Sequence, residues 1–128
     1  MAKGHRSQIK KERNQNKDTR PYAKLSHARI SAQKAGFVLD AIRGKDVQTA
    51  LAILEYNPRY ASSVIKKLLN SAIANAENNK GMNPENLYVD ECFANKATTM
   101  KRIRPRARGM AYRIEKRMCH ITIILNER

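Results

Sequence analysis

The positive charge of this 128-residue chain is confined to two segments. Residues 1–29 hold nine basic and two acidic residues, and residues 96–117 hold nine basic residues and one acid. Residues 30–95 carry seven charges of each sign, so the formal net charge of +15 comes entirely from the two flanks. We therefore expect the neutral body to form the folded core and the two basic segments to bind a polyanion.

The composition argues against several classes of protein. No apolar run approaches the roughly 20 residues that a membrane-spanning helix needs, and residues 1–6 lack the apolar stretch of a secretory signal. Two cysteines in a basic chain of this size do not indicate a disulfide scaffold. The length is typical of one domain, and we expect a soluble, intracellular polycation.

Three amphipathic patterns predict helices in the neutral body. The first follows Ser31, a suitable N-cap, and ends before Gly44, while the second follows a further N-cap, Asp46. The third has the most regular apolar spacing, at i, i+3, i+4 and i+7 across residues 61–76, and Pro58 is expected at its first helical position. Such a stripe is typical of a helix that faces a core.

Alternating patterns predict strands on either side of the second basic segment. Leu87, Val89 and Phe93 occupy positions of period two, residues 119–125 alternate apolar with other side chains, and residues 22–30 are a further candidate. The expected fold class is α+β, with three helices packed on one face of a small antiparallel sheet. A long β-hairpin and a basic N-terminal extension are expected to protrude from it.

We expect two parts along the chain. Residues 1–21 are polar with few apolar anchors, and this basic extension is predicted to be disordered in the free protein. Residues 22–128 are predicted to form a single domain that includes an extended hairpin, which we call the arm, at about residues 95–117.

Arginine alternates with other residues along the arm. In an extended chain alternate side chains share a face, so four guanidinium groups are expected on one side. Arginine suits phosphate because its planar fork donates two parallel hydrogen bonds and stays charged. These residues are Arg102, Arg104, Arg106 and Arg108.

The arm is expected to need a partner. An isolated two-stranded ribbon is marginal in water, and like charges that face each other across the strands would weaken it further. Pro105 suits an edge or a tip, and Gly109 permits a positive φ at the reversal. Two legs of about eleven residues would reach on the order of 35 Å, which indicates an arm threaded into folded nucleic acid.

Three apolar or aromatic residues of the arm have two interpretations each. Tyr112 either stacks on a base or fills its strand. Ile103 and Met110 are either ordinary surface residues or pack against ribose and base faces when the arm is buried.

Catalytic, cofactor and metal sites are not predicted. Cys92 and Cys119 lie far apart and neither belongs to a C-x-x-C motif, so each is interpreted as a small buried hydrophobe, and His120 should point to the opposite strand face from its neighbour. No nucleophile, base and oxyanion donor come together, and no glycine-rich phosphate loop is present. We expect a protein that is not an enzyme and has no cofactor.

Several motifs resemble the bacterial large-subunit ribosomal protein twenty-two family, from about Ala28 to the C-terminus. Lys116 and Arg117, followed by His-Ile-Thr, match the closing strand of that family. The other motifs are Ser-Ala-Gln-Lys at residues 31–34, Ile-Arg-Gly-Lys at 42–45, Asn-Ser-Ala-Ile-Ala-Asn-Ala-Glu-Asn at 70–78 and Lys-Arg-Ile-Arg-Pro-Arg-Ala at 101–107.

The resemblance implies a structural constituent of the large ribosomal subunit, in the ribosome and in the cytoplasm. It implies binding to 23S rRNA, a role in subunit assembly, and contacts with other large-subunit proteins, including ribosomal protein four near the tunnel constriction. The nascent polypeptide would pass the tip, and no membrane is involved. The implied tunnel-lining tip is Arg104, Pro105, Arg106, Ala107, Arg108, Gly109 and Met110. Members of the family often have a basic residue where this chain has Met110.

Nineteen cations are candidates for rRNA contact. A DNA-bending architectural protein is the alternative, because such proteins also use basic β-arms. The candidates are Lys3, Arg6, Lys10, Lys11, Arg13, Lys17, Arg20, Lys24, Arg29, Lys34, Lys96, Lys101, Arg102, Arg104, Arg106, Arg108, Arg113, Lys116 and Arg117.

Overall fold

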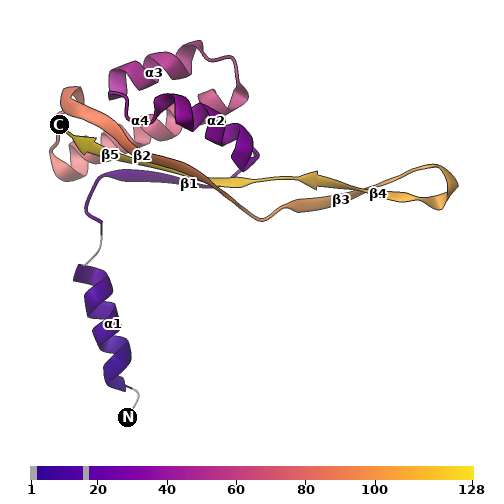
Figure 1. The fold of residues 1–128 in the computed structure, drawn as a ribbon, viewed down its shortest axis with the longest axis horizontal. Coiled ribbons are helices and arrows are strands. Elements are labelled where there is room, and N and C mark those ends of the chain that lie inside the picture. Colours follow the sequence, from indigo (N-terminus) through magenta and orange to yellow (C-terminus); the bar gives the residue numbers. More distant parts are fainter. Residues whose placement is uncertain (1–2, 16–17) are drawn as a thin grey trace.

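The computed structural model describes residues 3–15 and 18–128. Figure 1 shows a layer of helices on one face of a sheet, with a two-stranded arm that projects from it, which confirms the α+β class. The elements are α1 (Lys3–Gln15), β1 (Tyr22–Ala28), α2 (Ala32–Ile42), α3 (Val47–Tyr56), α4 (Tyr60–Lys80), β2 (Leu87–Lys96), β3 (Met100–Pro105), β4 (Ala111–Lys116) and β5 (Cys119–Glu127), with short 3-10 turns at Pro84–Asn86 and Ala107–Gly109.

The central sheet is antiparallel in the order β1-β5-β2. On β5, the alternate residues Cys119, Ile121, Ile123 and Leu125 are fully buried, so the predicted period-two pattern is confirmed. The inward side chains of this middle strand pack against the helices and form the sheet side of the core.

The helical layer buries the predicted apolar stripes. In α4, the buried Leu69, Ala72 and Ala76 follow the helical period, and small side chains let the helix approach the sheet closely. Ser31 caps α2 as predicted, since its hydroxyl accepts the Lys34 N–H at 3.4 Å. Gly44 follows the end of α2 with φ +72°, the left-handed conformation that glycine adopts without strain.

The start of α4 differs from the prediction. Pro58 does not occupy the first helical position, because the helix begins at Tyr60 with Arg59 as its N-cap. Asn57 is the C-cap of α3 and its side chain accepts the Arg59 N–H at 3.1 Å. Pro58 therefore lies in the connection, where its preference for an extended preceding residue separates the two helices.

The predicted face of Phe93 is wrong. A bulge at Asp90 shifts the register between β2 and β5, and one extra residue moves every later side chain to the other face. Leu87 and Val89 are buried before the bulge, and Cys92 is buried after it. Phe93 therefore points away from the helices and is 40% exposed.

The N-terminal extension contains α1, a helix that the sequence analysis did not predict. The prediction that residues 1–21 are disordered concerns the free protein and stays a prediction; residues 1–2 and 16–17 lie outside the described residues. Within the described part of the chain, every helix is too short or too polar to cross a membrane.

Stability is expected to reside in the helix–sheet core and not in the arm. Leu69→Ala should lower the free energy of unfolding by about 2–5 kcal/mol, because a fully buried leucine leaves a cavity. Ile114→Ala, in exposed β4, should change it by less than about 0.5 kcal/mol. Chemical denaturation measures both, and equal losses would show that arm and core unfold as one unit.

Candidate nucleic-acid interface

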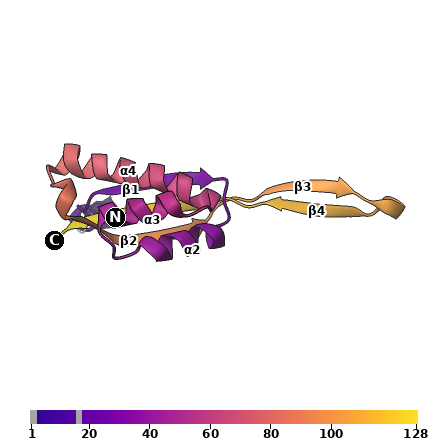
Figure 2. The ribbon, with the colours of Figure 1, turned by 90° about the horizontal axis from the view of Figure 1, so that it is seen from above.

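The arm leaves the core as a bare two-stranded ribbon. Figure 2 shows β3 and β4 projecting beyond the helical layer. At the base, the Ala97 N–H donates to the Met118 carbonyl at 3.0 Å, and the ladder resumes between Met100 and Lys116. All of β4 and all of β3 except half-buried Met100 are exposed. Within the chain, the backbone ladder is therefore the main support of the arm.

The register of the arm keeps cations from facing one another. Arg102 lies opposite Ile114, and Arg104 lies opposite Tyr112. The expectation that like charges face each other across the strands is therefore wrong. Five of the six pairs set a basic residue against an apolar, aromatic or acidic one, as in Lys101 opposite Glu115. This arrangement lowers repulsion along the ladder.

Cations alternate with apolar surface on the arm. Cross-strand partners share a face, so Arg102 and Arg104 lie on one face with Tyr112 and Ile114. The Arg106 guanidinium carbon lies 5.3 Å from the centre of the Tyr112 ring, within cation–π range. The ring is still 52% exposed, so it can contact a base as well. Charged groups for phosphates and apolar groups for sugars and bases thus lie side by side.

The tip reverses over residues 106–110. The Arg106 N–H donates to the Met110 carbonyl at 2.8 Å, and the Met110 N–H donates to the Ala107 carbonyl at 3.3 Å. Gly109 has φ +72°, which confirms its predicted role, and Arg108 also has a positive φ of 61°. The predicted alternation therefore extends to Arg106 and fails at Arg108, which belongs to the turn.

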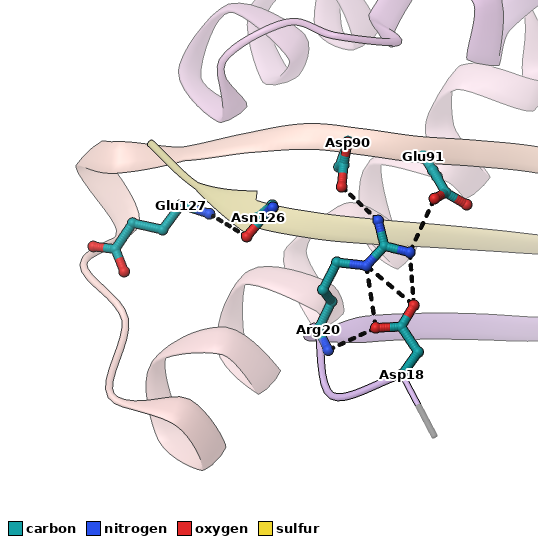
Figure 3. A network of polar contacts seen from close by, with 6 residues as sticks. All are labelled: Asp18, Arg20, Asp90, Glu91, Asn126 and Glu127. Atoms are coloured by element: carbon teal, nitrogen blue, oxygen red, sulfur yellow. Dashed lines mark hydrogen bonds and ion pairs between the residues drawn. The ribbon is translucent and has the colours of Figure 1, made fainter. Parts of the chain in front are cut away.

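Arg20 is committed to contacts inside the protein. Figure 3 shows its guanidinium surrounded by three carboxylates. It pairs with Asp18 at 2.7 Å, with Glu91 at 2.9 Å and with Asp90. The bulge in β2 turns the two neighbouring acids, Asp90 and Glu91, toward the same cation. Arg20 therefore ties the segment before β1 to β2.

Most other candidate cations are free to meet a partner. Those whose side chains are described are exposed, apart from the half-buried Arg20. Lys17 lies outside the described residues, and the side chains of Lys3 and Arg6 are not described. The exposed candidates are Lys10, Lys11, Arg13, Lys24, Arg29, Lys34, Lys96, Lys101, Arg102, Arg104, Arg106, Arg108, Arg113, Lys116 and Arg117.

Sequence reasoning missed a group at the base of the arm. Arg29, Lys34 and Arg117 line one groove together with Arg59 and Phe37, which were not candidates. The Arg59 guanidinium lies 5.6 Å from the centre of the Phe37 ring. Each of the two residues taken alone looks like an ordinary residue of a helical region, so only the packing of α2 against the start of α4 brings them together.

The two cysteines are structural. Both are buried and unpaired, and burial raises the pKa of each thiol. The Cys92 thiol donates to the Leu39 carbonyl at 3.3 Å, which fits the predicted role of a small buried side chain. Among the residues that the structure describes, no cluster of His, Cys, Asp and Glu could hold a metal ion.

The Asp18–Arg20 pair predicts a measurable titration. Hydrogen bonds from the Arg20 side chain lower the pKa of Asp18 from 3.8 to about 2. The charged carboxylate therefore favours the tied conformation above pH 3.8, and this contribution is lost as the pH falls through about 2.

An NMR titration of the Asp18 carboxyl group should give a pKa of about 2 in the wild-type protein. Arg20→Gln should return it toward 3.8, since the neutral amide donates weaker hydrogen bonds to a carboxylate. Lys24→Gln is the control, because it removes a nearby positive charge outside the network. In this variant the pKa of Asp18 should stay low. An unchanged pKa in Arg20→Gln would contradict the network.

Comparison with known proteins gives a consistent result across the folded region. A sequence model described as "Ribosomal protein L22p/L17e" matches residues 23–126, from β1 to β5 and including the arm. The large ribosomal subunit protein uL22 of Lachnoclostridium phytofermentans is 74% identical over 128 residues, 100% of both chains. The uL22 of Lachnospira eligens is 73% identical over the same coverage. That of Acetivibrio thermocellus is 57% identical over 104 residues, 81% of this chain and 83% of that protein.

Proposed function

This chain belongs to the ribosomal protein L22p/L17e family, and on that premise we propose that it is a structural constituent of the large ribosomal subunit. As part of the ribosome, it acts in the cytoplasm, binds rRNA and assembles with other ribosomal proteins. The alternative of a DNA-bending protein loses its main support, because the family match includes the arm on which it rested. Membership of a family of ribosomal proteins also agrees with a chain that is not an enzyme.

The arm is the observation that carries the proposal. Its strands have no apolar core of their own, and eight basic residues from Lys101 to Arg117 are accompanied by one acid, Glu115. Such a ribbon is stabilised when closely placed phosphates neutralise it. RNA that folds around both faces of the arm supplies phosphates that are as closely spaced as these cations.

We extend the proposal to the 23S rRNA and to the exit tunnel. A leg of about eleven extended residues reaches on the order of 35 Å, which is enough to enter a folded RNA and not only touch its surface. The exposed tip at residues 104–110 would line the polypeptide tunnel, near ribosomal protein four and the nascent chain. Met110, 58% exposed, makes that part of the wall less positive than a basic residue would.

The exposed cations of the leader and of β1 support a second contact with rRNA. Lys10, Lys11 and Arg13 lie on exposed positions of α1, and Lys24 lies on β1. Because Arg20 holds this region against β2, the leader starts from a defined place on the domain. We propose that it follows the rRNA surface from there and aids early subunit assembly.

Association with the ribosome can be tested in cell extracts. The protein should sediment with large subunits at low and moderate salt, because many phosphate contacts hold it. Treatment with RNase should release it, and treatment with DNase alone should not. Protein found free of subunits at low salt, or released by DNase alone, would contradict the proposal.

The arm should dominate the salt dependence of rRNA binding. Replacement of Arg104, Arg106 and Arg108 by Ala should lower the slope of log affinity against log salt by about two to three units, since each phosphate contact contributes about 0.7–0.9. The slope can be measured with the purified protein and a 23S-type rRNA transcript.

The matched control removes three exposed lysines of the neutral body, Lys45, Lys67 and Lys80. This variant loses the same charge and should keep a slope close to that of the wild-type protein. An equal change in both variants would mean that net charge, and not the arm, sets the affinity.

A further inference from the structure

A basic groove lies where the arm joins the helical layer. It has a volume of about 850 Å³ and is lined by the segment before α2, by α2, by the start of α4 and by the end of β4 with the residues after it. This volume falls within the roughly 300–1,000 Å³ of sites that bind small molecules. The groove is therefore large enough to receive one group of nucleotide size.

The charge of the groove favours an anion. Arg29, Lys34, Arg59 and Arg117 line it, and Glu115 is the one acid among its lining residues. Glu115 pairs with Arg117 at 3.5 Å, so three cations face the groove without a carboxylate from the lining residues. Two of the four cations, Lys34 and Arg59, come from residues 30–95, in which the two signs balance.

Two aromatic rings in the same groove are exposed. Phe37 is 58% exposed and Tyr60 is 71% exposed, although aromatic side chains usually bury most of their surface. The Arg59 guanidinium lies over the Phe37 ring at 5.6 Å. Unstacked bases in RNA-binding proteins stack on aromatic rings and on arginine planes, and both kinds of surface are present here.

The start of α4 forms part of the groove. Tyr60 and Ala61 line the groove at the first two positions of the helix. Its N-cap, Arg59, makes no side-chain capping bond, and the first turn holds no acid. The N–H groups at the start of a helix carry partial positive charge and can donate hydrogen bonds to an anion.

We propose that this groove binds a single extruded nucleotide of the rRNA, with its base on Tyr60 or on the Phe37–Arg59 pair and its phosphate beside Arg29 and Lys34. The inference rests on the proposed function and deepens it, because it names a second, base-stacking contact at the root of the arm. An acidic protein segment would satisfy the cations but would leave both rings without a flat partner. The combination of cations and exposed rings therefore favours RNA.

Affinity for a 23S-type rRNA transcript tests the groove. The double variant Phe37→Ala and Tyr60→Ala should bind about tenfold more weakly than wild type. The loss of one base–aromatic stack typically weakens binding by about this factor. The slope of log affinity against log salt should not change, since neither side chain is charged. Both residues are exposed, so the variant should keep its circular dichroism spectrum and its Tm.

Tyr56→Ala is the matched control. Tyr56 is 88% exposed at the end of α3 and is not among the lining residues, so its removal should change the affinity by less than about twofold. Ultraviolet cross-linking of assembled large subunits, followed by nuclease digestion and mass spectrometry, should give a nucleotide adduct on the peptide that holds Tyr60 or Phe37. The peptide segment around Tyr56 should carry none.

The outcomes separate the inference from the proposed function. Failure of the wild-type protein to bind the transcript would overturn the proposed function. Binding that is weakened by the arm variant but not by the groove variant would overturn only the nucleotide site. Loss of another ribosomal protein from subunits that carry the groove variant, with rRNA affinity unchanged, would assign the groove to a protein and would also overturn it.

Discussion

Repulsion among the cations of residues 96–117 determines which contacts the arm can make. The arm has no core to offset this repulsion, and its register reduces it by placing basic residues opposite Ile114, Tyr112 or Glu115. The pairing does not remove the excess charge of the arm, because eight residues between Lys101 and Arg117 are basic. The buried core lies in the helices and the central sheet, and we propose that RNA phosphates neutralise the arm. The same two stretches of chain therefore form part of the core, as β2 and β5, and then the arm, as β3 and β4.

The bulge at Asp90 serves the fold and the leader at the same time. It shifts β2 by one residue, which buries Cys92 and exposes Phe93. It also turns Asp90 and Glu91 toward Arg20, whose three carboxylate partners hold the segment before β1 in place. Local disruption of one ladder thus provides the anchor for a basic extension that has few apolar residues of its own. Arg20, a candidate for RNA contact in the charge pattern, forms this intramolecular tie.

We propose that the arm and the groove at its root make complementary contacts to RNA. Along the arm, guanidinium groups alternate with Tyr112 and Ile114 on one face. At the root, Arg59, Phe37 and Tyr60 combine charge with open aromatic surface. Arg117 belongs to both, since it follows β4 and also lines the groove. Charged contacts supply affinity that depends on salt, whereas stacking on a ring adds affinity that does not.

The three helices of the layer, the strands of the central sheet and the division of charge could be predicted from the sequence, because periodicity and net charge are properties of neighbouring residues. Residues 61–76 and 119–125 carry their buried faces in their spacing, and Gly109 marks the reversal of the arm. Only the tertiary structure decided the phase of β2 after Asp90, the place of Arg108 in the turn, and the partners of Arg20. It also assembled the groove from Arg29, Lys34, Phe37 and Arg59. These features depend on which distant segments meet in space, and no local pattern encodes that information.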